Sequence, residues 1–199
     1  MGAVRHWQVL FAGGALFATA LIADRVYAQF NPLSIVGRAV STAMDVRTKA
    51  EVTTDTEIST GASKRLLDDK RAEWTGVTLL VFAQHVVLAG AVKSEEARKI
   101  VEEVVRKDKR IRSLYNDLLV GDIGSLARDT ALEAEINASL TAAKGVSSVN
   151  MRWCATGGNV VLMGVAGSSG EAAAALANIR AVKGVKTVKS RLRVVPRKG

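Results

Sequence analysis

The hydrophobic pattern of this chain occurs twice, and the two copies keep a constant offset. Val86-Val87-Leu88-Ala89-Gly90 recurs as Val160-Val161-Leu162-Met163-Gly164. A polar segment with Ser and Glu follows each copy, and apolar positions at helical spacing come after it. Short β-branched runs of this kind predict buried strands, and each one leads into a helix. The chain is therefore expected to contain one structural unit in two copies, and we call the offset from Val86 to Val160 the repeat offset.

The flanking positions predict the other elements of each unit. Asp55-Thr56 and Asp129-Thr130 are expected to start the first helix, because side-chain oxygens there can accept from unpaired N–H groups. Alternating apolar positions then predict a strand, and Gly157-Gly158-Asn159 marks the turn of a hairpin in the second copy. The second helices are expected near Glu95–Lys107 and Glu171–Val182, and a last strand closes each unit. The inward positions of these last strands are Ile111, Leu114, Leu118 and Val120 in the first copy, and Val185, Val188, Leu192 and Val194 in the second.

These elements predict an α+β protein made of two tandem two-layer α-β-β-α-β domains. The first domain is expected at residues 55–122 and the second at residues 125–196. Two helices on one face of a small sheet form a minimal two-layer domain. Neither copy is large enough to be very stable alone, so docking between the two is plausible.

The N-terminus predicts export from the cytoplasm. No charge occurs between Trp7 and Ala23, and Val26-Tyr27-Ala28 places small or permissive residues at the positions that a signal peptidase reads. We therefore predict a signal peptide over residues 1–28 with cleavage after Ala28; an uncleaved single-span anchor is the alternative. Residues 29–54 are expected to form a linker or partly ordered arm.

The basic charge of the chain lies mostly in the second copy. The formal net charge is +9, of which residues 1–54 contribute +2, residues 55–124 contribute 0 and residues 125–199 contribute +7. A basic module beside a neutral one indicates an anionic partner, although a well-solvated surface without a partner gives the same pattern.

Few side chains are suited to catalysis or metal binding. Cys154 is the single cysteine, and His6 and His85 are the two histidines. A disulfide within the chain and a Cys- or His-rich metal site are therefore excluded. His85 is expected at a solvated hairpin turn and Cys154 as an inert packed thiol. We predict no catalytic residue, no metal site and no cofactor.

The strongest candidate site is the basic last strand of the second copy. Its apolar positions point to the core, so Lys189, Arg191 and Arg193 are expected in a row on the opposite face. Such a row could meet an anionic membrane, or it could simply protect a sheet edge from aggregation. The other candidate lipid-binding residues are Lys183, Lys186, Arg152 and Arg180.

Several motifs together resemble the BON domain, which occurs in tandem in bacterial envelope proteins. They are Val86-Val87-Leu88-x-Gly90 and Val160-Val161-Leu162-x-Gly164, Glu96-Ala97 and Glu171-Ala172, Lys183-Gly184-Val185-x-x-Val188-x-Ser190-x-Leu192, and the arm from Gly37 to Asp45-x-Arg47-Thr48. The first copy departs from the family with Arg110-Ile111 in place of Gly-Val. The resemblance implies phospholipid association and support of envelope integrity rather than catalysis. The chain has no lipid-anchor cysteine after its apolar segment, so both a free periplasmic protein and an inner-membrane anchor stay open.

Two functions follow as hypotheses. The first is a non-enzymatic envelope protein that binds anionic phospholipid through the basic second domain. The second is a periplasmic adaptor in which the neutral first domain docks a protein partner or another copy of the chain. A nucleic-acid partner is not expected, because no GxxG loop joins two helices and stacking aromatics are few.

Overall fold

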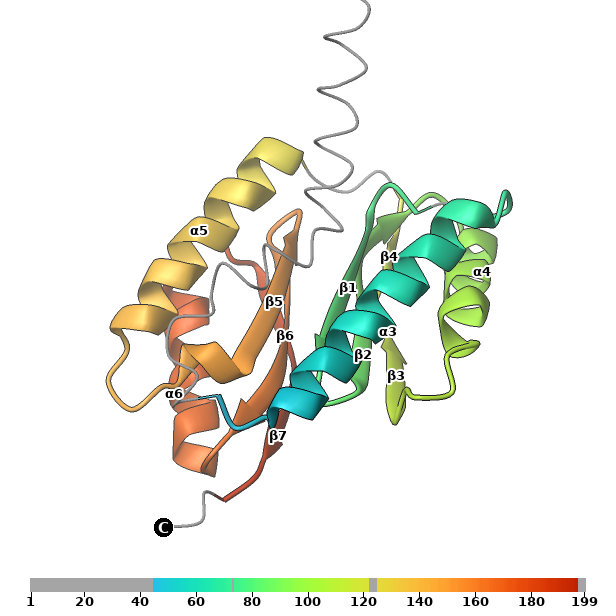
Figure 1. Ribbon diagram of the computed structural model, residues 1–199. Coiled ribbons are helices and arrows are strands. Elements are labelled where there is room, and N and C mark those ends of the chain that lie inside the picture. Colours follow the sequence, from blue (N-terminus) through green and yellow to red (C-terminus); the bar gives the residue numbers. More distant parts are fainter. Residues whose placement is uncertain (1–44, 73, 122–124, 197–199) are drawn as a thin grey trace, which may run out of the picture.

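A computed structural model of the protein describes residues 45–72, 74–121 and 125–196. These residues form two α/β units that follow one another along the chain (Figure 1). The first unit contains α3 (Lys49–Asp68), β1 (Val77–Phe82), β2 (His85–Val92), α4 (Glu95–Arg106), β3 (Ser113–Asn116) and β4 (Leu119–Val120). The second unit contains α5 (Leu126–Ala142), a 3₁₀ turn (Ser148–Asn150), β5 (Met151–Thr156), β6 (Asn159–Ala166), α6 (Ser169–Ala181) and β7 (Thr187–Val194). The prediction of an α+β chain with two tandem α-β-β-α-β units is confirmed.

Each unit is a mixed sheet covered by two helices on one face. In the second unit β6 is central, antiparallel to β5 and parallel to β7. In the first unit β2 is central, antiparallel to β1 and parallel to β3 and β4. The parallel neighbour of β2 is split because Asp117 and Leu118 interrupt the ladder, whereas β7 runs unbroken. The predicted continuous last strand is therefore found in the second unit alone.

The first helices begin earlier than their Asp-Thr pairs. Helix α3 starts at Lys49, because Thr48 accepts from the backbone N–H of Glu51 while Glu51 accepts from that of Thr48. This reciprocal capping box satisfies N–H groups that the helix itself leaves unpaired. Helix α5 starts at Leu126, also before its Asp-Thr pair, but its N-cap residue Ser125 makes no side-chain capping bond. Residues 49–54, expected in the linker, thus belong to the first helix.

Asp55 and Asp129 instead cap the hairpin turns. The carboxylate of Asp55 accepts from the backbone N–H groups of Ala83 and Gln84, both at 2.7 Å, and Asp129 accepts from that of Gly157 at 2.9 Å. In both hairpins the two turn residues have positive φ, as a type I′ turn requires. In each copy the Asp of the Asp-Thr pair therefore connects the first helix with the hairpin turn, and the pair does not mark the start of the helix.

The first hairpin makes its turn without glycine, and this predicts a stabilising substitution. Gln84 has a φ of 65°, where the Cβ of an L-residue crowds the backbone. Gln84→Gly is expected to raise the free energy of unfolding by about 0.5–1 kcal/mol in urea denaturation. The reciprocal change Gly158→Gln, at the same place in the second hairpin, should lower it, because a Cβ there would lie 2.7 Å from the Gly184 carbonyl oxygen. A destabilising Gln84→Gly would contradict this account.

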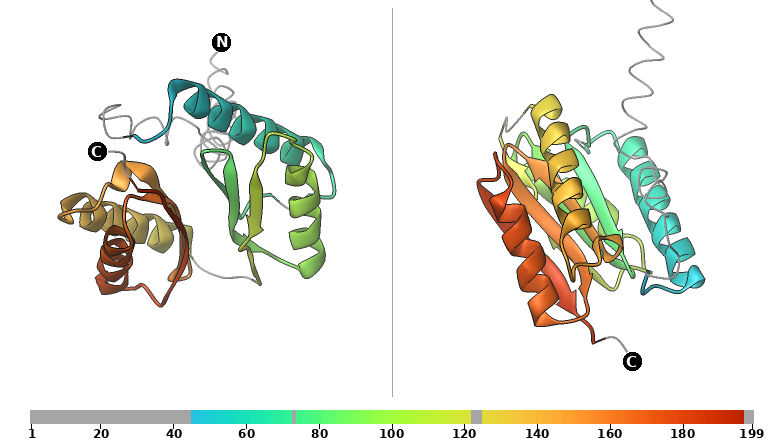
Figure 2. Two further views of the ribbon diagram at one scale, coloured as in Figure 1. Left: turned by 90° about the horizontal axis from the view of Figure 1, so that it is seen from below. Right: turned by 90° about the vertical axis from the view of Figure 1, so that its left-hand side faces the viewer.

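The two sheets pack against each other through the faces that the helices leave uncovered (Figure 2). This gives four layers: helices, sheet, sheet, helices. The intersheet core is wholly apolar apart from the thiol; its members are Leu80, Phe82, Ala83, Val87, Ala89, Cys154, Val161, Met163 and Val165. The repeat offset relates Leu80 to Cys154, Val87 to Val161 and Ala89 to Met163. Equivalent positions thus face each other, as in a symmetric dimer formed within one chain.

Candidate functional site

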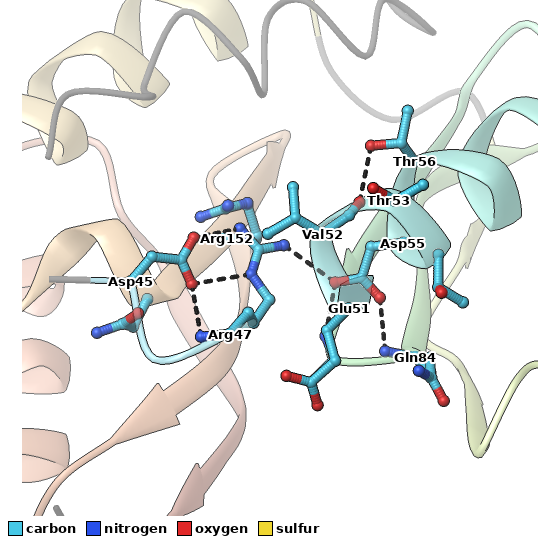
Figure 3. Close-up of polar contacts among 12 residues, drawn as sticks. Asp45, Arg47, Glu51, Val52, Thr53, Asp55, Thr56, Gln84 and Arg152 are labelled. Atoms are coloured by element: carbon cyan, nitrogen blue, oxygen red, sulfur yellow. Dashed lines mark hydrogen bonds and ion pairs between the residues drawn. The ribbon is translucent and has the colours of Figure 1, made fainter. Parts of the chain in front are cut away.

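A short segment before α3 fastens the two units together, and we call residues 45–48 the strap (Figure 3). The backbone N–H of Val46 donates to Oδ1 of Asn150, in the second unit, at 3.0 Å. The next residue, Arg47, pairs with Asp45 at 2.6 Å and with Asp55 at 3.0 Å. Its side chain is only 6% exposed. The strap therefore connects a loop of the second unit with the first helix of the first.

Phe82 lies where the strap meets the intersheet core. The guanidinium of Arg47 lies 4.3 Å from the centre of its ring, and that of Arg152 lies 5.4 Å from it. Arg152 is buried and donates to the backbone carbonyls of Val149 and Met151. Arg152 therefore lies inside the molecule. It is not on the surface with the other candidate lipid-binding cations.

The row on β7 points away from the helices, as its alternation indicates, but it faces the first unit. Lys189, Arg191 and Arg193 lie beside Val161, Met163 and Val165 of the intersheet core. Arg191 donates to both oxygens of Asp117, at 2.8 and 2.9 Å, and its guanidinium lies 4.3 Å from the centre of the Tyr115 ring. Lys189 also reaches Asp117, at 2.6 Å. Two members of the row are therefore engaged with the first unit.

Asp117 is the acidic counterpart of this row, and its side chain is 1% exposed. Burial alone would raise the pKa of Asp117, but hydrogen bonds from Arg191 and Lys189 outweigh burial and lower it below its ordinary value. The repeat offset relates Asp117 to Arg191. This ion pair therefore joins equivalent positions of opposite charge.

A second group of candidate residues lies on the far end of the second unit. Arg180, Lys183 and Lys186 are exposed around the end of α6 and the start of β7. The backbone N–H of Lys186 donates to the carbonyl of Gly158, so this loop adjoins the β5–β6 hairpin turn. Among the residues that the structure describes, none of these three cations forms an ion pair. The structure thus separates the predicted set into an exposed end, an intersheet row and the buried Arg152.

A cavity of about 200 Å³ lies between the two units, beside β7. The first unit lines it with His85, Val87 and Tyr115, and the second with Met163 and the residues 190–193. The sequence placed His85 at a solvated turn, but its Nδ1 lies 2.6 Å from Oγ of Ser113, and burial and the cations Arg193 and Arg112 lower its pKa. Sequence reasoning missed this cavity, because no local pattern reports contacts between the two copies.

The thiol of Cys154 is poorly suited to act as a nucleophile. Burial raises the pKa of the Cys154 thiol to about 12, so it stays protonated inside the intersheet core. Within residues 45–72, 74–121 and 125–196, no three His, Cys, Asp or Glu side chains gather where they could hold a metal. None of the helices in these ranges combines the length and apolar character of a membrane span. The predicted cleavage point at Ala28 lies outside the described residues.

Comparison with protein families matches both units to the BON domain, over residues 54–122 and 128–196. The chain belongs to the BON-domain family. Proteins with BON domains are typically periplasmic or envelope-associated, and the family is generally non-catalytic. The two BON domains account for the repeat seen in the sequence.

Individual relatives add little beyond the family. An uncharacterised protein encoded in the gshII 5′ region of Anaplasma centrale is 32% identical over 102 residues, which cover 49% of this chain and 68% of that protein. Two solved structures of CdsD, a structural protein of the type III secretion system of Chlamydia trachomatis, are each 15% identical, with TM-scores of 0.31 and 0.30. These alignments cover 69% and 66% of this chain and 63% and 62% of the CdsD chains, less than two thirds of their length. The likeness to CdsD is distant.

Proposed function

We propose that this protein is a non-enzymatic envelope protein that binds anionic phospholipid through its second BON domain and so supports membrane integrity. The observation that carries the proposal is the exposed end of that domain. Arg180, Lys183 and Lys186 gather there without an acidic partner among the described residues. Each lysine or arginine near an anionic bilayer contributes about 1 kcal/mol of attraction, which decays within about 8–10 Å at physiological salt.

An exposed apolar side chain at this end also favours a membrane surface. The carboxylate of Asp129 accepts from the backbone N–H of Gly157, so the start of α5 adjoins the hairpin turn at this end. Leu126, the first residue of α5, is 58% exposed and lies one turn before Asp129. An apolar side chain beside a cluster of cations is suited to the boundary between lipid headgroups and acyl chains.

Charge reversal at this end should weaken lipid binding. In co-sedimentation with phosphatidylglycerol vesicles at low salt, we expect residues 29–199 to bind. The double variant Lys183→Glu/Lys186→Glu should bind at least about tenfold more weakly, because it removes two attractive charges and adds two repulsive ones. Raising the salt to about 0.5 M should weaken the binding of the unaltered protein, since the attraction is screened.

The first domain provides a matched control. Lys109 is exposed, and the repeat offset relates it to Lys183, so it stands at the same place in the first repeat. Lys109→Glu should leave vesicle binding nearly unchanged if the second domain binds the lipid. Equal losses of vesicle binding for Lys109→Glu and Lys183→Glu would contradict a specific lipid-binding surface on the second domain. No vesicle binding at low salt would contradict the lipid hypothesis and favour an adaptor.

In the alternative hypothesis, an adaptor that docks a protein partner or a second copy, the open sheet face of the first domain is not available for docking. The sheet face of the first domain is covered by the second domain, through Leu80, Phe82 and Val87. A protein partner or second copy would therefore have to use a helix face or a sheet edge.

A further inference from the structure

Two arginines on one wall of the cavity between the BON domains differ in their ion pairing. Arg191 and Arg193 both line it, from the same face of β7. Arg191 is neutralised by its bidentate ion pair with Asp117. Arg193 is partly buried, and within the described part of the chain it forms no ion pair. One wall of the cavity therefore holds a cation without a direct counter-charge.

A second guanidinium, that of Arg112, lies near Arg193. Burial and the neighbouring guanidinium of Arg112 lower the pKa of Arg193, while Tyr115, Asp55 and Glu51 act on it more weakly in the opposite sense. The same two arginines, after burial, depress the pKa of His85. Arg112 and His85 lie close together in the first domain, and the docked second domain brings Arg193 to them. The guanidinium groups of Arg112 and Arg193 are like charges brought together, and a bound anion stabilises them.

His85 adds a hydrogen-bond donor to the cavity wall. When the Ser113 hydroxyl donates to Nδ1 of His85, the proton of the ring is on Nε2, which can donate to a ligand. A volume of about 200 Å³ corresponds to roughly six or seven water molecules, enough for a phosphoryl group with its hydration.

We propose that this interdomain cavity binds the phosphoryl group of a small anion or of a lipid headgroup, held by Arg193 and His85. The site is separate from the exposed end of the second domain. The extended chain from Lys186 to Arg193, at about 3.3 Å per residue, places these two cations roughly 20 Å apart. Because both domains line the cavity, a bound anion stabilises their docked arrangement.

Thermal unfolding of the full chain, kept in a non-ionic detergent, tests the site. Inorganic phosphate is compared with sodium chloride at equal ionic strength. The unfolding midpoint is expected to rise by about 3–5 °C when phosphate reaches ten times its dissociation constant. Arg193→Gln should abolish this rise and His85→Gln should reduce it. Lys189→Gln, on the same face of the same strand but outside the cavity, should preserve it.

The same variants distinguish a free phosphoryl compound from a lipid headgroup, and the cavity from the exposed end of the second domain. A phosphate-dependent rise that requires Arg193 supports capture of a free phosphoryl compound. Binding of phosphatidylglycerol vesicles that is weakened by Arg193→Gln, without a response to phosphate, supports a lipid headgroup. Lys183→Glu/Lys186→Glu should leave the phosphate response intact, so failure at the exposed end is distinct from failure at the cavity. If neither phosphate nor vesicle binding depends on Arg193, the proposal is overturned.

Discussion

Replacing Gly164 by alanine is expected to lower the free energy of unfolding by about 3–5 kcal/mol, a large part of the stability of a protein of this size. Gly164 has a φ of 127°, in a region that L-residues rarely adopt. A Cβ there would lie 2.1 Å from the carbonyl oxygen of Asn150 and 2.9 Å from Cα of Met151. Both neighbours are backbone atoms, so relief requires a shift of β5 against β6.

The effect should extend beyond the second sheet. Asn150 receives the strap through its side chain, so a displaced Asn150 also weakens the contact with Val46. We expect the thermal midpoint to fall by roughly 6–20 °C. Gly90→Ala should behave alike, since its Cβ would lie 2.0 Å from the Gly76 carbonyl oxygen. Gly170→Ala is the matched control: only Oγ of Ser168, at 3.7 Å, is near, so stability should hardly change. Equal stabilities of Gly164→Ala and Gly170→Ala would refute this account.

The role of this glycine shows how far a repeated pattern can predict a fold. Val86-Val87-Leu88-x-Gly90 and its second copy predicted a buried strand and its register, because apolar side chains on both faces leave few alternatives. The structure shows crowding at this glycine against the start of the preceding strand, at Gly76 in the first copy and at Asn150 in the second. That contact crosses the hairpin, and the periodicity of one strand does not report it.

The candidate site was less predictable than the fold. Alternation along β7 placed Lys189, Arg191 and Arg193 on one face, and the structure has them there. What this face meets depends on the partner sheet, and a single strand carries no information about it. A signal did exist: Leu80 and Cys154, like Val87 and Val161, are apolar on the face that the helices leave uncovered. Two sheets with such faces bury them best against each other.

Removing the side chain of Arg47 is expected to cost about 2–4 kcal/mol in the free energy of unfolding. Arg47 is the partner of two carboxylates, and Asp55 is 5% exposed, so Arg47→Ala leaves a buried negative charge without its cation. The expected loss of unfolding free energy is smaller than the largest values for broken buried ion pairs, because Asp55 retains hydrogen bonds from the backbone N–H groups of Ala83 and Gln84. The contact with the Phe82 ring is lost as well. Urea denaturation of the full chain measures this change.

Arg47→Lys and pH dependence separate this mechanism from a general loss of packing. A lysine keeps the charge but cannot reach both Asp45 and Asp55 with the planar fork of a guanidinium, so it should recover only part of the stability. Burial raises the pKa of Asp45, but hydrogen bonds from Arg47 outweigh burial and hold it below its ordinary value. A depressed carboxylate pKa stabilises the fold above about pH 4 and loses this contribution as the pH falls through the folded-state value. The difference between the unaltered protein and Arg47→Ala should therefore narrow below about pH 4. A difference that stays constant throughout this acid range would show that Arg47 acts through its apolar stem alone.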